Sequence, residues 1–213
     1  SIGHMSDNFL SLPVLPEKPR STGLTHVLDK GITLGSMESH LESYAEFADV
    51  WKFGWGTAYV EKLLLSKIGL LREHGITACL GGTLLEIAWS QGRASECLDW
   101  AEQAGFTAIE VSRGVADMSM EAKWELIRTS AQSFRVFAET GYKSAERPLT
   151  PTQWHAEIMG DLAAGAEYIV AEGRESGTVG LYDSHGMPQT EVIDAALLAA
   201  GLDRVLFEAP RKN

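Results

Sequence analysis

Short apolar runs alternate with longer amphipathic stretches along most of the chain. Apolar positions that recur every three or four residues predict helices, and short β-prone runs predict strands. The predicted strands are Leu24–Leu28, Val50–Phe53, Ile76–Leu80, Ala108–Val111, Val136–Ala138, Tyr168–Ala171 and Arg204–Phe207. The predicted helices are Ser36–Phe47, Ala58–His74, Leu84–Gln91, Ala94–Ala104, Ser119–Ser133, Pro151–Ala164 and Glu191–Ala200. Repeated strand-then-helix units predict a parallel sheet covered by helices.

Several predicted helix ends carry local signals. Glycine follows the last helical residue at Gly75, Gly105, Gly165 and Gly201, where a helix can stop in a left-handed conformation. Ser119 is a predicted N-cap with Glu121 in the first turn. Thr150 is a predicted cap followed by proline at the first helical position.

The polar residues favour a closed barrel over a doubly wound open sheet. Charged or hydroxyl side chains and glycines follow nearly every predicted strand, whereas an open sheet concentrates its site at one switch point. No Gly-x-Gly-x-x-Gly follows the first strand. We therefore predict an α/β protein with a (β/α)₈ TIM-type barrel. Seven strands are identifiable, and the eighth β/α unit that would close the barrel is missing.

The length of the chain and the composition of its N-terminal stretch predict one main domain. Of the 213 residues, Ser1–Met5 have the sequence of a tag-cleavage scar, and the proline-rich stretch that follows predicts an irregular lead-in over residues 1–23. The barrel domain is expected over residues 24–213, incomplete at its C-terminal end. No apolar run approaches the roughly 18 to 20 residues needed to span a bilayer.

Charge and cysteine content limit the partners. A net charge of −11 argues against nucleic-acid binding, which needs a basic face, but not against small anionic substrates. Cys79 and Cys97 lie in apolar or helical contexts and are predicted to be buried free thiols in a reducing compartment. No secretory signal is visible, so we expect a cytoplasmic protein without membrane partners.

The residues that follow the strands resemble those of the phosphosulfolactate synthase family. The matching segments run in the family's order from about Leu24 to Asn213: Val27–Gly31, Trp51–Thr57, Gly81–Leu84, Glu110–Ser112, Glu139–Gly141 with Lys143, Glu172–Gly177 and Phe207–Pro210. Lys-Phe-Gly-Trp-Gly-Thr and Glu-Gly-Arg-Glu-Ser-Gly are the most specific of them.

The resemblance implies a (β/α)₈ barrel that adds sulfite to phosphoenolpyruvate with Mg²⁺, giving (2R)-phospho-3-sulfolactate for coenzyme M synthesis. Two departures stand out. Arg113 occupies a position where the family usually has Asp or Asn, and the chain stops before the family's eighth strand and helix. Two alternatives stay open: a related barrel enzyme that adds another nucleophile to a phosphorylated enol acid, and a non-catalytic homologue of the heat-stress type.

This chemistry needs a phosphate site, a cation at the carboxylate, a path for sulfite and a general acid. The resemblance assigns the general acid to Lys143, whose competing interpretation is a solvated loop lysine. Glu139 and Glu172 end strands and are the predicted Mg²⁺ ligands, with Glu110 and Glu208 as alternatives. Structural pairing with a lysine or arginine is the competing interpretation for each glutamate.

The remaining predicted site residues bind anions. Arg174, Ser176 and Gly177 are predicted to hold phosphate through a guanidinium and backbone N–H groups. Lys30 and Lys52 are predicted to act on sulfite or the substrate carboxylate. Two further predicted substrate-site residues are Arg113, an added cation beside the rim, and Asp29, which is expected to orient a lysine rather than do chemistry.

Aromatic residues and histidines add little. Trp51, Phe53 and Trp55 are predicted to pack rather than to bind ligand, and Trp89, Trp100, Trp124 and Trp154 to pack helices on the barrel. The histidines show neither metal-ligand spacing nor a Ser/His/Asp set, which argues against a hydrolase triad. We expect small anionic partners and a homo-oligomer.

Overall fold

The sheet contains seven parallel strands in sequence order. The computed structural model describes residues 10–11, 14–141, 149–173 and 180–209. Each neighbouring pair of strands is parallel, from β1·β2 through β6·β7. The strands are β1 (His26–Asp29), β2 (Val50–Phe53), β3 (Thr77–Leu80), β4 (Ala108–Val111), β5 (Arg135–Thr140), β6 (Tyr168–Ala171) and β7 (Val205–Phe207).

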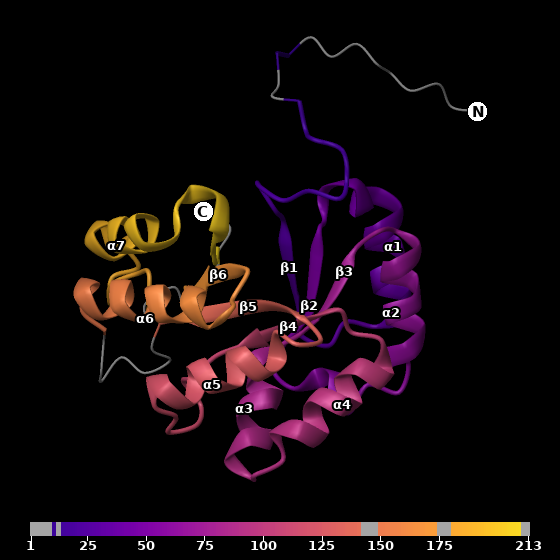
Figure 1. Ribbon diagram of the computed structural model, residues 1–213. Helices are drawn as coiled ribbons and strands as arrows, with labels where there is room; N and C mark the ends of the chain where they lie inside the picture. The colour runs from indigo at the N-terminus through magenta and orange to yellow at the C-terminus, as the bar shows by residue number, and fades with distance from the viewer. Residues whose placement is uncertain (1–9, 12–13, 142–148, 174–179, 210–213) are drawn as a thin grey trace.

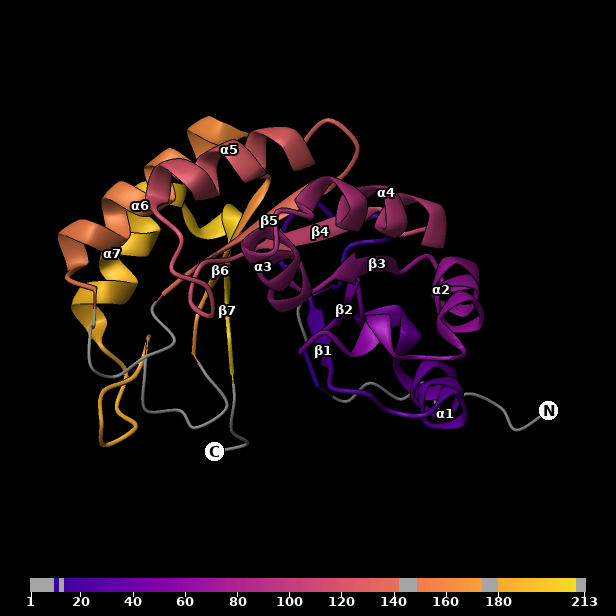
Figure 2. The ribbon, with the colours of Figure 1, turned by 90° about the horizontal axis from the view of Figure 1, so that it is seen from below.

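The helices follow the strands and lie on the outer side of the sheet. They are α1 (Leu34–Tyr44), α2 (Leu64–Glu73), α3 (Gly82–Ser90), α4 (Ala94–Ala104), α5 (Met120–Ser130), α6 (Pro151–Ala164) and α7 (Thr190–Ala200), with short 3₁₀ turns η1 (Ala45–Phe47), η2 (Thr57–Tyr59) and η3 (Leu202–Arg204). Figures 1 and 2 show the sheet curling inside this layer of helices. The predicted barrel-type fold is confirmed, with seven strands. Within the described residues β1 and β7 are the two edges of the sheet.

Strand residues alternate between two apolar layers. On β5, Val136 and Ala138 point outward into the large core beneath the helices, while Phe137 belongs to a second cluster inside the curve of the sheet. The same alternation puts Trp51 and Phe53 of β2 outside and Val50 inside. Successive side chains of a strand lie on opposite faces, so the interior receives every second residue. The predicted packing of Trp51 and Phe53 is confirmed.

All fourteen predicted elements are present, and five of them match the structure at both ends. Val50–Phe53, Ala94–Ala104, Ala108–Val111, Pro151–Ala164 and Tyr168–Ala171 match at both ends. The predicted helix Ala58–His74 is wrong over its first turns, because α2 begins only at Leu64. The backbone before it is bent by local side-chain bonds, including one from the Leu63 N–H to Glu61 Oε1 at 2.9 Å.

The predicted helix-end signals are largely confirmed. Gly75, Gly105, Gly165 and Gly201 all have positive φ, at 65°, 95°, 117° and 75°. Gly201 has ψ of 159°, so it ends α7 in an extended glycine conformation rather than the predicted left-handed one. Ser119 accepts a bond from the Ala122 N–H. Thr150 forms a capping box with Gln153.

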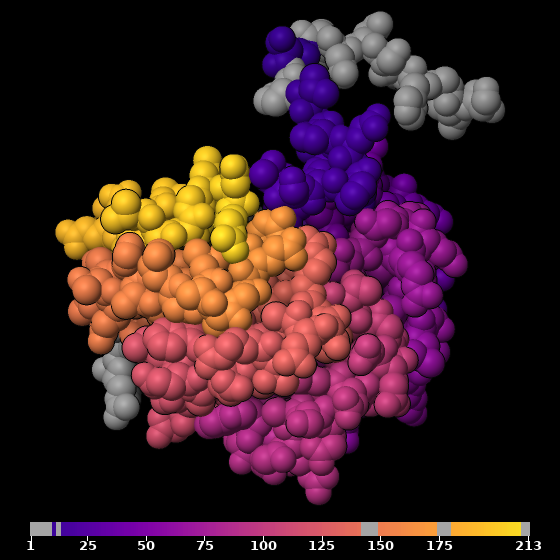
Figure 3. All heavy atoms as spheres, viewed as in Figure 1, coloured from indigo at the N-terminus to yellow at the C-terminus, as the bar shows by residue number. Residues whose placement is uncertain are grey.

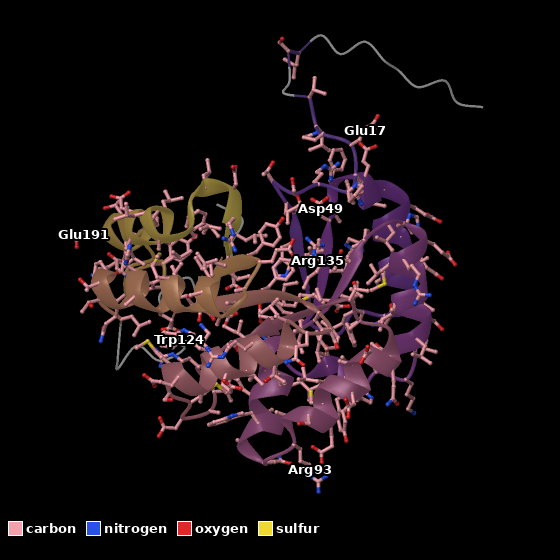
Figure 4. All side chains as sticks on the ribbon, in the orientation of Figure 1. Glu17, Asp49, Arg93, Trp124, Arg135 and Glu191 are labelled. Atoms are coloured by element: carbon pink, nitrogen blue, oxygen red, sulfur yellow. The ribbon has the colours of Figure 1, made fainter. Side chains whose placement is uncertain are left out.

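Ion pairs tie together the face at the amino ends of the strands. Arg20 pairs with Asp49 at 2.8 Å, and Arg135 makes a forked contact to Glu167 at 2.9 Å through each of two nitrogens. Asp49 and Arg135 are labelled in Figure 4. The Tyr168 hydroxyl donates to the Ser21 carbonyl at 2.7 Å, so the N-terminal lead-in crosses this face. Figure 3 shows the early and late parts of the chain meeting here. In barrels this end of the sheet serves stability.

Two further predictions concern cysteines and tryptophans. Cys79 and Cys97 are both free and buried, as predicted. Trp154 is fully buried, and Trp89, Trp100 and Trp124 pack against the core from the helices, as predicted. A search of the described helices finds none that is long and apolar enough to cross a membrane.

Candidate active site

A cavity of about 1010 Å³ opens at the carboxyl ends of the strands. It extends down between the two edge strands, where Leu24 and His26 face Val205 and Leu206. Binding sites of parallel barrels lie at this end of the sheet. Its charged lining residues come from almost every strand end: Lys30, Lys52, Glu110, Glu139, Glu172 and Glu208.

Lys52 lies at the centre of the charged lining. Its ammonium is 2.6 Å from Glu110, 3.5 Å from Glu208 and 3.8 Å from Glu139. Burial alone would lower the pKa of Lys52, but these carboxylates outweigh it and raise the pKa above its usual range. Lys52 therefore stays protonated and acts as a fixed positive charge rather than as a proton donor.

Glu110 has a pKa well above the usual range of a glutamate. Burial, together with the nearby carboxylates of Glu139 and Glu208, raises the pKa of Glu110 to about 7 although Lys52 opposes the shift. Its other oxygen accepts the Gly82 N–H at 3.1 Å. A carboxyl group with this pKa is half protonated near neutral pH and can exchange a proton with a bound molecule.

Glycines let helix α3 begin at the cavity wall. The Gly81 N–H donates to the Phe53 carbonyl at 3.0 Å, and a Cβ at Gly81 would lie 2.6 Å from that same oxygen. Gly81, Gly82 and Thr83 all line the cavity. The sequence Gly-Gly-Thr thus allows the first turn of α3 to approach β2 closely.

Lys30 and Trp55 meet at the mouth of the cavity. The Lys30 ammonium is 5.2 Å from the centre of the Trp55 ring, and both residues line the cavity. Trp55 is 58% exposed, so it does not pack in the core but lies at the rim beside Lys30. Its φ of 58° makes it the non-glycine residue with positive φ among those described. A left-handed conformation costs such a residue roughly 1–2 kcal/mol.

Asp29 supports the loop that carries Lys30. Its carboxylate accepts the Gly31 and Ile32 N–H groups at 2.7 and 2.9 Å, and the Trp51 indole N–H at 3.2 Å. The buried ammonium of Lys67, on α2, lies 4.0 Å away. Asp29 does not appear among the residues that line the cavity, and its predicted part in substrate binding stays a prediction.

Arg113 belongs to a buried ionic cluster outside the sheet. Its guanidinium makes a forked contact to Glu157, on α6, at 2.9 and 2.7 Å. Glu157 also accepts a bond from Lys123, on α5, at 2.9 Å, and Lys123 reaches Asp161 at 2.7 Å. Arg113 does not appear among the cavity-lining residues, so its predicted role in substrate binding stays a prediction.

The pKa values of the two carboxyl groups in this cluster are shifted in opposite directions. Burial raises the pKa of Asp161 to about 6, against the pull of Lys123. Burial also opposes the ionisation of Glu157, but Lys123 and Arg113 lower its pKa below the usual range. Burial tends to lower the pKa of Lys123 as well, yet Asp161 and Glu157 raise it. Glu157 is thus the charged partner of both cations.

Glu86 anchors the loop after β4. Its carboxylate, buried on α3, accepts the backbone N–H groups of Gly114, Val115 and Ala116 at 3.0, 2.7 and 2.9 Å, and a bond from the Ser112 hydroxyl. Three converging N–H groups form a nest that favours an anion. Val115 lines the cavity, so Glu86 positions part of its wall.

The sequence did not single out His26. Its ring stacks on Phe137 at 5.5 Å, and Phe137 stacks on Tyr168 at 5.3 Å, across the interior of the sheet. Burial, with Lys52 nearby, lowers the pKa of His26 to about 3, so the ring is neutral. Within the described residues its buried Nε2 makes no hydrogen bond. His26 also lines the cavity, which makes it a floor residue of the site.

The predicted metal ligands lie on neighbouring strands. Glu139 is the penultimate residue of β5, Glu172 follows β6, and both line the cavity. The Glu172 N–H bonds to the Thr140 carbonyl at 2.9 Å, which fixes the two strand ends side by side. Among the described residues no group of three or more His, Cys, Asp or Glu side chains is arranged to hold a metal. Mg²⁺ often uses only one or two protein carboxylates plus water and substrate oxygens, so Glu139 and Glu172 stay the predicted ligands.

Four predicted site residues cannot be placed. Lys143, Arg174, Ser176 and Gly177 lie outside the described part of the chain. Gly173, the last described residue before Arg174, donates its N–H to Glu208 at 3.1 Å. The roles assigned to these four residues stay predictions.

Fold and cavity together define a (β/α)-barrel protein with its charged cavity at the carboxyl ends of the strands. Among solved structures it is similar to deoxyribose phosphate aldolase from Aeropyrum pernix (TM-score 0.53, 13% identity, 88% of this chain and 85% of that one). It is also similar to a 3-hexulose-6-phosphate synthase (TM-score 0.50, 17% identity, 85% and 76%). At these identities the likeness shows the fold alone.

Sequence comparison narrows the class to a family of enzymes. The model of the (2R)-phospho-3-sulfolactate synthase family matches residues 13–213. A phosphosulfolactate synthase of Bacillus subtilis is 36% identical over 98% of this chain and 84% of its own length. One of Methanocaldococcus jannaschii is 38% identical over 90% and 78%. The chain belongs to the phosphosulfolactate synthase family.

Proposed function

We propose that this protein joins sulfite to phosphoenolpyruvate to give (2R)-phospho-3-sulfolactate, with Mg²⁺ as its cofactor. The observation that carries the proposal is the match to three proteins named phosphosulfolactate synthase, at 34 to 38% identity. Lys30 and Lys52 in the cavity support it, because both substrates are small anions that need cationic partners. A coenzyme M pathway and a cytoplasmic location belong to the same proposal.

The reaction forms one carbon–sulfur bond. The sulfur lone pair of sulfite attacks the methylene carbon, and the electrons of the double bond move toward the carboxylate. C2 then takes up a proton. A bound Mg²⁺ would stabilise negative charge on the carboxylate. Glu139 and Glu172 are the residues that would hold it.

Side chains of the protein itself would bind the anionic substrates and supply the proton. Lys52 stays charged and would attract the substrate carboxylate or sulfite, rather than deliver the proton. Lys30 would add a second positive charge at the cavity mouth. We assign the donation of the proton to C2 to Lys143, and this assignment rests on the family resemblance. Glu110, whose pKa is about 7, is a second group able to exchange a proton within reach of Lys52.

The alternative nucleophile loses its main motivation. It rested on Arg113 as an added cation in the substrate site, and the guanidinium is instead paired with Glu157. We therefore favour sulfite. A non-catalytic homologue is also disfavoured, because the relatives that the chain matches are named as synthases.

The direct test is to incubate the purified protein with sulfite, phosphoenolpyruvate and Mg²⁺ and to follow the product by ³¹P NMR. We expect a new phosphate-ester resonance that disappears when Mg²⁺ is chelated. Glu172→Gln should lose most of this activity, whereas Glu167→Gln, at the opposite end of the sheet, should retain it. No product from folded wild-type protein contradicts the proposal.

A further inference from the structure

The segment Gly54–Thr57 is a tight turn with an unexpected residue. The Thr57 N–H donates to the Gly54 carbonyl at 3.0 Å, and the two central residues, Trp55 and Gly56, have φ of 58° and 72°. Positive φ at both central positions defines a type I′ turn, which favours Gly, Asn and Asp. A tryptophan is therefore a backbone outlier at this position.

Packing does not explain the outlier. The Trp55 side chain is 58% exposed, whereas the neighbouring Trp51 is buried in the main core. An exposed indole recovers little hydrophobic stabilisation. Strained residues that persist without a packing reason cluster at functional sites.

The turn holds the indole against a charged residue of the cavity. Lys30 comes from the loop after β1 and lies over the ring at 5.2 Å. Its loop is fixed from below, where Asp29 accepts two of its backbone N–H groups. The ring face attracts an ammonium through its quadrupole. An indole carries no net charge, so the contact with Trp55 orients the Lys30 ammonium without itself adding a negative charge beside it.

We propose that Trp55 is a positioning residue for anionic substrates, and that its strained turn holds the Lys30 ammonium at the cavity mouth. The inference rests on the proposed function for the identity of the anion. It assigns Trp55 no direct chemistry. Its effect passes through Lys30, so it acts on substrate affinity rather than on the chemical step.

The test is a double-mutant cycle on affinity. Binding of phosphoenolpyruvate with Mg²⁺, without sulfite, is measured by calorimetry for wild type, Trp55→Gly, Lys30→Met and the double variant. We expect Trp55→Gly to weaken binding roughly 2- to 5-fold, the strength of an exposed cation–π contact. The same substitution should have no effect in the Lys30→Met background.

Further variants separate positioning from structure. Trp55→Gly should raise the urea midpoint of unfolding, because glycine suits the turn, while Trp55→Phe should keep the strain and recover most of the affinity. Tyr59→Ala is the matched control, since Tyr59 is an exposed aromatic of the same segment (70%) that does not appear among the cavity-lining residues. It should bind like wild type.

The outcomes are distinct. Unchanged affinity in Trp55→Gly, or an equal loss with and without Lys30, overturns the inference and leaves the proposed function standing. A positive cycle in a protein that forms no carbon–sulfur product overturns the proposed function alone. Wild-type protein that does not bind phosphoenolpyruvate overturns both.

Discussion

Lys123 Nζ donates a hydrogen bond to the Glu139 carbonyl at 2.8 Å. Lys123 lies on a helix outside the sheet, whereas the side chain of Glu139 lies inside it. Strand β4 ends at Val111, so β5 extends past its neighbour. Lys123 thus donates the hydrogen bond to this carbonyl at a point where the neighbouring strand no longer supplies a backbone N–H. The position of Glu139 in the cavity depends in this way on a residue that does not appear among the cavity-lining residues.

Loss of the Lys123 charge should be costly. Lys123→Met would leave Glu157 and Asp161 buried without their ammonium, and breaking a buried pair from one side costs about 3–5 kcal/mol. We expect that loss in urea unfolding. Arg93→Met is the control, because Arg93, labelled in Figure 4, pairs with Glu96 in solvent and should change stability by less than about 1 kcal/mol. A loss below about 1 kcal/mol for Lys123→Met would contradict this account.

Stability should fall as the pH rises from about 4.5 to about 7. Because the pKa of Glu110 is raised from 4.5 to about 7 in the folded protein, the folded state binds this proton more tightly than the unfolded state. The contribution is complete below about pH 4.5 and is lost as the pH passes 7. Asp161, raised from 3.8 to about 6, adds the same trend at lower pH.

Urea unfolding at several pH values tests this assignment. Glu110→Gln should flatten the upper part of the pH profile, and Asp161→Asn the lower part. An unchanged slope between pH 6 and 7 in Glu110→Gln would show that another group carries it.

Arg113 and Glu157 should be energetically coupled. Their forked contact is largely buried, and hydrogen bonds to charged groups contribute about 1.5–3 kcal/mol. Unfolding of Arg113→Met, Glu157→Gln and the double variant measures that coupling, and the KM of Arg113→Met should stay near that of wild type. A large rise in KM would instead restore the substrate role that the sequence predicted.

Gly81 and Gly69 form a contrasting pair. A Cβ at Gly81 would press on the Phe53 carbonyl, so Gly81→Ala should lose about 1–3 kcal/mol of stability and widen the gap between α3 and β2. Gly69 lies inside α2 with open space around it, so Gly69→Ala should gain up to about 1 kcal/mol. Chemical denaturation measures both. Equal effects would show that the close approach at Gly81 does not matter.

The sequence predicted the barrel and its rim, but not what holds the rim in place. Short β-prone runs and glycines at helix ends are local signals, and they predicted that Lys52, Glu139 and Glu172 lie at or near strand ends. Glu86 and Lys123 lie on helices, where charged residues usually face solvent. Their partners are 16 to 38 residues away in the chain, so only the folded geometry reveals them.

Trp55 escaped prediction for a different reason. Tryptophan usually packs, and the sequence does not state φ. The backbone of the folded turn, with φ of 58° at Trp55, shows the left-handed conformation at this position. Arg113 shows a different limit of sequence reasoning: its predicted substrate role stays a prediction, and its forked contact to Glu157, on α6, appears only in the folded structure.

The strand order of the sheet has a kinetic consequence. Every described strand pair joins neighbours along the sequence, so each β/α unit can dock on the one before it at a small cost in loop entropy. Folding can then proceed unit by unit. The Tyr168–Ser21 hydrogen bond spans 147 residues and belongs to the last contacts to form. Its removal by Tyr168→Phe should speed unfolding and leave the folding rate almost unchanged.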